Sequence, residues 1–282
     1  MVYLIVPTYG RIKETKKFLD SLQQCINKNY LIIIIDDHPE KLTSKSIEQN
    51  SNLIILTSKK ELWWVGSINL GIKTLFNDYY LEENDIVVFA NNDIEIDKKS
   101  FEILCYEINK NKDQILHPRT INQDGLEVSS GTKVVTFFPY ITRHPKNFKN
   151  EKEIIDMGTA RFLMMSGSVL RKVGYINKKL VQYGGDNDFT LSAKRFHNIN
   201  TYLIRDSVCK LDDTFTGIKN QNIKTIRELY KSFFSIKSPN NIKFRYLLIK
   251  KFFGNIAAFF IALSMSINTF IKFFLRNRSE RT

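Results

Sequence analysis

Two acidic clusters are the groups in this sequence best placed to do chemistry. Asn91-Asn92-Asp93 follows, after Ala90, an apolar run at residues 86–89 that is typical of a buried strand. A carboxylate at the carboxyl end of such a strand is well placed to hold a divalent metal at the crevice of an α/β fold. Asp186 and Asp188 lie in a glycine-rich turn that leads into a helical pattern, a position that suits a general base. A metal site with a separate base predicts group transfer from a nucleotide donor.

These carboxylates also have simpler interpretations. Consecutive asparagine and aspartate residues are ordinary turn residues, so Asn91-Asn92-Asp93 on its own also fits a turn. An aspartate ahead of a helix commonly caps it, and Asp186 is therefore a candidate for a cap as well as for a base. The Asp36-Asp37 pair ends another apolar run, where a carboxylate either accepts hydrogen bonds from a nucleobase or ribose group or caps a helix or turn.

Two further segments carry side chains suited to a nucleotide pocket. Thr8 follows the apolar run at residues 2–6, so Thr8, Asp37 and Asp93 are all expected at the carboxyl ends of strands. Trp63-Trp64 precede a glycine-containing helical pattern at residues 66–71, where the rings are suited to wall a sugar or base pocket and helix amides favour a phosphate. The alternative for at least one of the two tryptophans is a position in the core.

The elements that must position these groups follow from the hydrophobic pattern. Strands are predicted at residues 2–6, 30–35, 53–56, 86–89 and 202–204, and helices at residues 12–27, 67–76, 99–110 and 188–196. Fully apolar strands that alternate with helices indicate a parallel sheet covered on both faces. Residues 116–154 are mixed, with a strand-like piece at 134–138. The prediction is therefore an α/β domain at residues 1–217, with a Rossmann-like, mostly parallel central sheet.

The sequence changes character after residue 217. Residues 223–234 and 244–253 are basic, aromatic and helical in spacing, and residues 252–271 carry no charge between Lys250-Lys251 and Lys272. That length is close to a membrane span, but Gly254 and several Ser, Asn and Thr residues interrupt the apolar run. A helix or helical hairpin lying in the membrane plane is the favoured interpretation of residues 218–282, ahead of a single span and of a dimer-forming tail.

Composition narrows the classes of protein. The chain of 282 residues is 43% hydrophobic and carries a formal net charge of +13. The basic excess lies late, beside apolar stretches, which favours an anionic membrane surface, although plain solubility is the simpler explanation. No zinc-finger spacing or RNA-binding signature is present, so a nucleic-acid partner is not predicted. Three unpaired cysteines and an amino terminus that enters a strand without a leader predict a cytoplasmic protein.

Taken in order, these motifs resemble the family 2 glycosyltransferases of the GT-A fold over residues 2–217. The resemblance implies an inverting transfer from a nucleoside-diphosphate sugar, UDP- or dTDP-linked, with Mn²⁺ or Mg²⁺ as cofactor. Asp186 matches the catalytic base, with Asp188 as a supporting acid, and Asp93 matches the metal-binding Asp-x-Asp motif. The implied nucleotide-sugar site comprises Pro7, Thr8, Tyr9, Arg11, Asp37, Trp64, Gly66, Asn69, Asn91 and Asn92.

The chain departs from the family pattern at three positions. Asn91 replaces the first Asp of Asp-x-Asp, and Gly185 replaces the Glu that precedes the base. No histidine lies near residues 209–214, where many relatives bind metal, so Asp212 or Asp213 is the candidate substitute.

The resemblance also implies a biological setting. Bacterial relatives with such tails build capsule, O-antigen or other surface polysaccharide on lipid-linked saccharide acceptors. This predicts a peripheral enzyme on the cytoplasmic face of the plasma membrane, with a homodimer as one expected state. Rhamnosyl, galactosyl and glucosyl transfer all fit the resemblance. The alternatives are a catalytically degenerate assembly protein and a basic nucleic-acid-binding protein.

Overall fold

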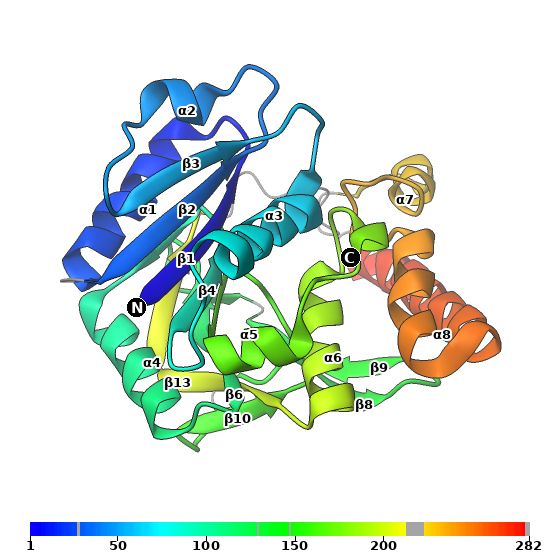
Figure 1. Cartoon of the computed structure of the whole chain (residues 1–282). Helices are drawn as coiled ribbons and strands as arrows, with labels where there is room; N and C mark the ends of the chain where they lie inside the picture. Colours follow the sequence, from blue (N-terminus) through cyan, green and yellow to red (C-terminus); the bar gives the residue numbers. More distant parts are fainter. Residues whose placement is uncertain (27–28, 129, 147, 213–222, 280–282) are drawn as a thin grey trace.

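The apolar runs of the amino-terminal half form four neighbouring parallel strands (Figure 1). In the computed structural model, which describes residues 1–26, 29–128, 130–146, 148–212 and 223–279, they follow the order β3, β2, β1, β4. Their bounds are Val2–Thr8 for β1, Tyr30–Asp36 for β2, Leu53–Thr57 for β3 and Ile86–Ala90 for β4. The predicted parallel arrangement of this half is confirmed.

The sheet continues past β4 with strands of mixed direction. The added strands are β12 (Phe162–Ser166), β6 (Gln114–Ile121), β13 (Asn200–Leu211) and β10 (Lys152–Ile155). β12 is antiparallel to β4 and β6, whereas β13 is parallel to β6. Short strands β5 (Ile94–Ile96) and β7 (Glu127–Val128) pair with β13 and β6, and a separate ribbon comprises β11 (Met157–Gly158), β8 (Gly131–Thr136) and β9 (Ile141–Arg143).

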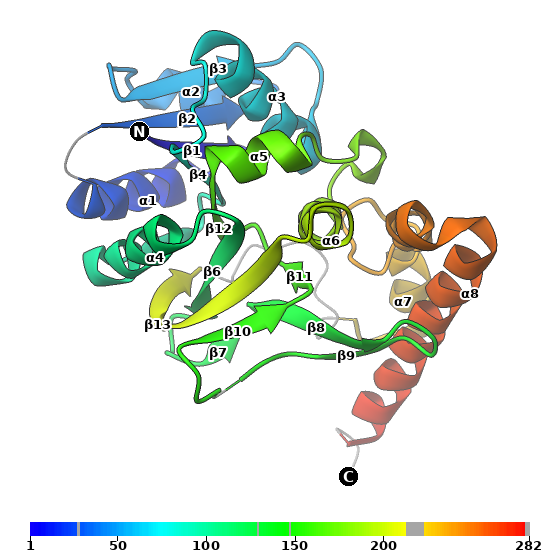
Figure 2. The same cartoon turned by 60° about the horizontal axis from the view of Figure 1, so that its bottom comes forward.

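Helices cover both faces of the sheet (Figure 2). α1 (Ile12–Cys25) and α4 (Lys98–Lys110) pack on one face, and α3 (Trp63–Asp78), α5 (Gly167–Val173) and α6 (Gly185–His197) pack on the other. Short helices α2 (Leu42–Ser46) and η1 (Lys178–Leu180) join strands and helices. Successive β1 residues alternate between the two cores, Leu4 toward α1 and Ile5 toward α3, so the central residues of this apolar strand are buried on both faces of the sheet.

The carboxyl-terminal region is helical, as predicted. It contains α7 (Ile226–Ser232) and the long α8 (Ile242–Ser279), which Gly254 interrupts with a left-handed φ of 76°. Arg245 in the first arm of α8 donates hydrogen bonds to Ser266 and Thr269 in the second, so the arms fold back on each other as a hairpin. The predicted domain boundary at residue 217 lies outside the described residues.

The α8 hairpin packs beside α6 and the β8–β9 ribbon (Figure 1). Ser264 accepts a hydrogen bond from the backbone N–H of Tyr140 at 3.0 Å, and Asn268 donates one to the Tyr140 carbonyl. The polar residues of the second arm, Ser264, Ser266, Asn268 and Thr269, therefore face the protein. By length and composition, the stretch Ile242–Arg276 is also sufficient to cross a membrane.

Candidate active site

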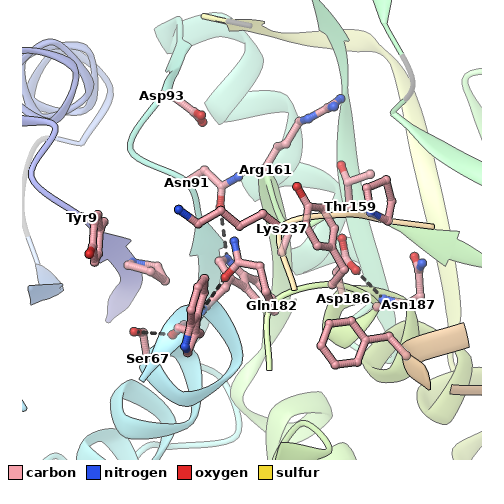
Figure 3. Close-up of a pocket in the computed structure, with 18 of the residues that line it drawn as sticks. Tyr9, Ser67, Asn91, Asp93, Thr159, Arg161, Gln182, Asp186, Asn187 and Lys237 are labelled. Atoms are coloured by element: carbon pink, nitrogen blue, oxygen red, sulfur yellow. Dashed lines mark hydrogen bonds between the residues drawn. The ribbon is translucent and has the colours of Figure 1, made fainter. Parts of the chain in front are cut away.

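A cavity of about 820 Å³ opens at the carboxyl ends of β1, β2 and β4 (Figure 3). Parallel strands deliver their carboxyl ends to one edge of the sheet, where ligand groups gather. Most of the predicted site residues line this cavity, namely Pro7, Thr8, Tyr9, Arg11, Asp37, Trp64, Asn91, Asn92, Asp93 and Asp186.

The loop after β1 forms one wall. Thr8 is buried, and its hydroxyl donates to the Ile35 carbonyl at 3.3 Å and contacts the Thr43 hydroxyl at 3.0 Å. Tyr9 is half exposed and packs edge-on against His38, with ring centroids 5.0 Å apart. Thr8 therefore fixes the loop, while Tyr9 presents an aromatic surface to the cavity.

Asp37 anchors the start of α3. Its two carboxylate oxygens accept the backbone N–H groups of Leu62 and Trp63, each at 2.7 Å. Burial raises the pKa of Asp37, and these two hydrogen bonds oppose the shift. The helix-capping interpretation thus holds, and Asp37 also lines the cavity. Next to it, the indole N–H of Trp64 donates to Oδ1 of Asn91 at 3.2 Å and joins α3 to the first acidic cluster.

Asp93 is buried near one end of the cavity. Its Oδ2 accepts from Arg11 at 3.0 Å, and its Oδ1 has no hydrogen-bond partner among the described residues. Burial raises the pKa of Asp93, and the positive charges of Arg11 and Arg161 oppose that shift. Neighbouring Asn92 donates to the Thr15 hydroxyl at 2.8 Å, which holds the cluster against α1.

The cluster fits a hard divalent cation that takes most of its ligands from a substrate. Such a cation needs oxygen ligands, and the unpartnered Oδ1 of Asp93 is a buried oxygen in the cavity wall. Across the described part of the chain, no group of three or more His, Cys, Asp or Glu side chains gathers for metal binding. Asp212 lies next to Asp93, because its backbone N–H donates to the Asp93 carbonyl at 2.9 Å, but Asp212 is not among the lining residues. Asp213, the other candidate ligand, lies outside the described residues.

Asp186 faces the cavity from the first turn of α6. Desolvation raises its pKa, against hydrogen bonds from the backbones of Asn187 and Ala160 and the positive charge of Arg161. Figure 3 shows Asp186 and Asn187 on the side of the cavity opposite Tyr9, with Arg161 and Lys237 between Asp186 and Asp93. A carboxylate with a raised pKa in a pocket is suited to take a proton.

Four predicted residues are placed elsewhere. Gly66 packs against Leu62 inside α3, and Asn69 exchanges two hydrogen bonds of 2.9 Å with the Ile176 backbone. Both therefore support the wall without reaching the cavity. Asp212 is the third.

Asp188 is the fourth, and it holds the tail. Its carboxylate is almost fully buried and forms an ion pair with the ammonium group of Lys251 in α8, at an N–O distance of 3.0 Å. It also accepts a hydrogen bond from the backbone N–H of Asn177 at 3.1 Å. Asp186 and Asp188 are two residues apart in α6, which places them about 200° apart around the helix axis, so the two aspartates of the motif face different surroundings.

Several cavity residues were not among the predicted site residues. Arg161, Gln182 and Thr159 line it from the central segments, and Lys237, Phe244, Arg245, Leu248 and Met265 line it from the carboxyl-terminal region. Only folding brings the tail to the cavity. The basic run that contains Lys237 and Arg245 was visible, but its position was not.

Comparison with known proteins identifies the family to which the chain belongs. Residues 3–174 match the family model described as Glycosyl transferase family 2. This chain belongs to that family. As a family 2 glycosyltransferase it has the GT-A fold, with a mostly parallel nucleotide-binding half and a carboxyl-terminal helical region.

Individual relatives agree with this assignment. The family 2 chain is 31% identical over 141 residues to the low-salt glycan biosynthesis hexosyltransferase Agl10 of Haloferax volcanii, covering 48% of this chain and 44% of that protein. It is 23% identical over 210 residues to a glycosyltransferase of Haemophilus influenzae, covering 73% and 66%. The matches thus span less than two thirds of either relative.

Solved structures share the fold at low sequence identity. A structure of GalNAc-T7 with UDP, GalNAc and Mn²⁺ superposes with a TM-score of 0.58 at 10% identity, over 75% of this chain and 43% of that one. Residues 1–349 of TarS from S. aureus superpose with a TM-score of 0.53 at 15% identity, over 96% and 72%.

Proposed function

We propose that this protein is an inverting glycosyltransferase that moves a sugar from a nucleoside diphosphate to a hydroxyl of a saccharide acceptor. The observation that carries the proposal is one cavity with two carboxylates in different roles. Asp93 presents a buried, unpartnered oxygen near one end, and Asp186, with its raised pKa, faces the cavity from the other side.

The reaction follows from these two groups. Asp186 takes the proton of the acceptor hydroxyl as that oxygen attacks the anomeric carbon, and the bond to the diphosphate breaks on the opposite face. One displacement through an oxocarbenium-like state inverts the anomeric centre. Nucleotide binding by the loop after β1 and by the start of α3 positions that carbon for attack.

The departing diphosphate needs positive charge. Arg161 and Lys237 line the middle of the cavity, and Lys237 has no ion pair among the described residues. Asp93 would hold a divalent cation, Mn²⁺ or Mg²⁺, which when bound supplies Lewis-acid stabilisation to the diphosphate oxygens. The donor-side residues proposed for nucleotide recognition are Pro7, Thr8, Tyr9, Arg11 and Asn91.

The acceptor side is proposed to meet a membrane. The outward face of the α8 hairpin is apolar and exposed over several turns, at Phe253, Ile256, Phe259, Phe260, Leu263, Ile267, Phe270, Ile271, Phe274 and Leu275. Lys250 and Lys272 are exposed beside it. An apolar face flanked by cations is the pattern of a helix that lies in the plane of an anionic membrane.

We further propose that the hairpin lies in the membrane plane. A spanning orientation would expose the polar residues that now bond Arg245 and Tyr140, and would separate Lys251 from Asp188. A lipid-linked saccharide, as used in capsule, O-antigen or other surface-glycan synthesis on the cytoplasmic face of the membrane, is the acceptor that this geometry suits best.

Calorimetric titration of the full-length protein with UDP, dTDP and GDP, each with and without Mn²⁺, tests the proposal. We expect one nucleotide to bind more tightly with Mn²⁺, and Asp93→Ala to remove that dependence. Nucleotide binding with no transfer from any matching donor would instead indicate a degenerate assembly protein. A folded protein that binds none of the three nucleotides would overturn the proposal.

A further inference from the structure

A fully buried histidine contacts a residue of the cavity wall on the side away from the cavity. His117 lies on β6 with no exposed surface and is not a lining residue. Its Nδ1 hydrogen-bonds the Pro118 carbonyl, and its Nε2 lies 2.8 Å from Oγ1 of Thr159. Thr159 lines the cavity, so this contact connects the buried ring to the site.

The proton positions follow from the partners. A carbonyl oxygen only accepts hydrogen bonds, so Nδ1 must carry the proton that bonds Pro118. Burial lowers the pKa of His117 to about 4, although the backbone carbonyl groups of Pro118 and Thr159 favour the cation, and the charge of Arg161 lowers it further. The ring is therefore neutral at pH 7, and its unprotonated Nε2 accepts the hydrogen of the Thr159 hydroxyl.

This fixes what Thr159 offers to a ligand. A threonine hydroxyl has one hydrogen and two lone pairs, and the hydrogen is committed to His117. The hydroxyl oxygen can only accept hydrogen bonds from the cavity. A ligand group beside it must therefore be a donor, such as a sugar hydroxyl or amide N–H.

Thr159 is also close to the proposed base. The backbone of the next residue, Ala160, hydrogen-bonds the Asp186 carboxylate, and the backbone N–H of Gly158 donates to Thr190 of α6 at 3.2 Å. Figure 3 shows Thr159 on the same side of the cavity as Asp186 and Asn187. A ligand whose hydroxyl reaches Asp186 thus brings its neighbouring hydroxyls within range of this wall.

We propose that Thr159 is a specificity-determining residue that accepts a hydrogen bond from a saccharide hydroxyl bound beside Asp186, and that His117 fixes the direction of that bond. The inference rests on the proposed glycosyl transfer and adds a recognition rule to it. The hydroxyl belongs either to the acceptor or to the donor sugar, and the experiment separates these sources.

The proton arrangement is measured first, without any substrate. Long-range ¹H–¹⁵N correlation spectra of the ¹⁵N-labelled full-length protein in detergent report the tautomer of each of the four histidines. His117, identified as the signal missing in His117→Gln, should keep a protonated Nδ1 and an unprotonated Nε2 from pH 5.5 to 8. A protonated Nε2 would overturn the proposal whatever the protein binds.

Recognition is measured with deoxy sugars. In the donor arm, calorimetry compares the nucleotide sugar that binds with its monodeoxy forms. In the acceptor arm, transfer to p-nitrophenyl glycosides is compared with transfer to their monodeoxy forms. We expect one position at which removal of the hydroxyl costs the wild type about tenfold, the usual effect of one lost hydrogen bond.

Two variants assign that loss to Thr159. Thr159→Val should lose about tenfold on the parent sugar and nothing further on the critical deoxy sugar, whereas Thr159→Ser should discriminate like the wild type. Thr132→Val is the matched control, because Thr132 lines the same cavity and contacts His144, and it should keep the full discrimination. If Thr159→Val and removal of the critical hydroxyl lower binding or transfer additively in both arms, the two groups do not interact and the proposal is overturned. If the wild type neither binds nor transfers any sugar, the glycosyl-transfer function itself fails, and the saccharide role of Thr159 fails with it.

Discussion

At the residue scale, Asp186 makes the pH dependence of the reaction testable. A general base works only when deprotonated, and burial raises the pKa of Asp186. Transfer should therefore fall as the pH drops through this raised pKa, at a higher pH than an ordinary aspartate near 3.9 would give. Asp186→Asn should lower kcat by about 10²–10⁴-fold and leave nucleotide affinity nearly unchanged.

Initial rates from pH 4 to 8, with calorimetry of the variant, provide the check. Loss of nucleotide binding in Asp186→Asn would show that the carboxylate organises the cavity rather than the proton transfer.

Gly185 explains a departure from the family motif. A Cβ at this position would lie 2.6 Å from Cγ2 of Val65 and 3.0 Å from the Trp64 ring, so the close approach of α3 excludes a larger side chain. Gly185→Ala should lower the free energy of unfolding by about 1–3 kcal/mol through overpacking. Denaturant unfolding measures this.

The clash has a matched control. Val65→Ala removes the methyl group that a new Cβ would meet, so the double variant Gly185→Ala/Val65→Ala should be less destabilised than the sum of the single changes. Simple additivity would locate the cost elsewhere than in this contact.

Sequence reasoning found residues that follow strands and missed those that arrive from a distance. Thr8, Asp37 and Asp93 were predictable, because an apolar run marks its own carboxyl end and parallel strands end at one edge. Nothing local marks Arg161 or Lys237, since their place in the cavity depends on how later segments pack. The same limit applies to Asp188, whose partner lies on α8.

At the element scale, Lys251 and Asp188 join α8 to α6. Asp188 is 1% exposed at its side chain and Lys251 is 32% exposed, so the carboxylate of the ion pair is withdrawn from water while the lysine stays partly solvated. Lys251→Met leaves a buried carboxylate without its cation and should cost about 2 kcal/mol or more in unfolding free energy. Adding Asp188→Asn should recover part of that loss, because the uncompensated charge is gone.

Unfolding of the two single variants and the double variant completes a double-mutant cycle. A coupling energy near zero would mean that α8 is held to α6 by apolar contacts alone, such as the stacked rings of Phe196 and Phe252.

Element boundaries show which patterns a sequence reveals. β13 extends from Asn200 to Leu211, whereas only residues 202–204 were predicted as a strand. A register shift between Ile204 and Val208 interrupts its pairing, and the charged Arg205-Asp206 falls there, so the alternation breaks. The hairpin in α8 was one of the predicted alternatives, and Gly254 is the residue that creates it.

At the scale of the whole molecule, the outer face of α8 should control membrane binding. The triple variant Ile256→Ser/Ile267→Ser/Leu275→Ser removes three side chains that are between 51% and 78% exposed. Because little core packing is lost, folding should be retained, while partition onto anionic vesicles should fall by at least about tenfold. Sedimentation with vesicles of phosphatidylglycerol and phosphatidylcholine measures it.

A matched variant carries equally exposed apolar changes elsewhere. Tyr80→Ser/Tyr106→Ser alters side chains that are 78% and 66% exposed on the nucleotide-binding half and should not reduce sedimentation. An equal effect of both variants would indicate nonspecific adsorption of exposed apolar side chains to the vesicles rather than a dedicated membrane-binding face. Deleting the tail is a poorer test, because Phe244 and Leu248 belong to the core.

The two arms of α8 have a consequence for how this enzyme can change over evolutionary time. Phe244, Arg245, Leu248 and Met265 line the cavity, while other positions on the same arms are exposed. If the outward positions contact lipid as proposed, they need only remain apolar and can change among Leu, Ile and Phe, whereas the inward positions must keep their shape and charge. Alternating fast-changing and slow-changing positions along one helix would then distinguish, in the sequence alone, the proposed lipid-facing side from the side that lines the cavity.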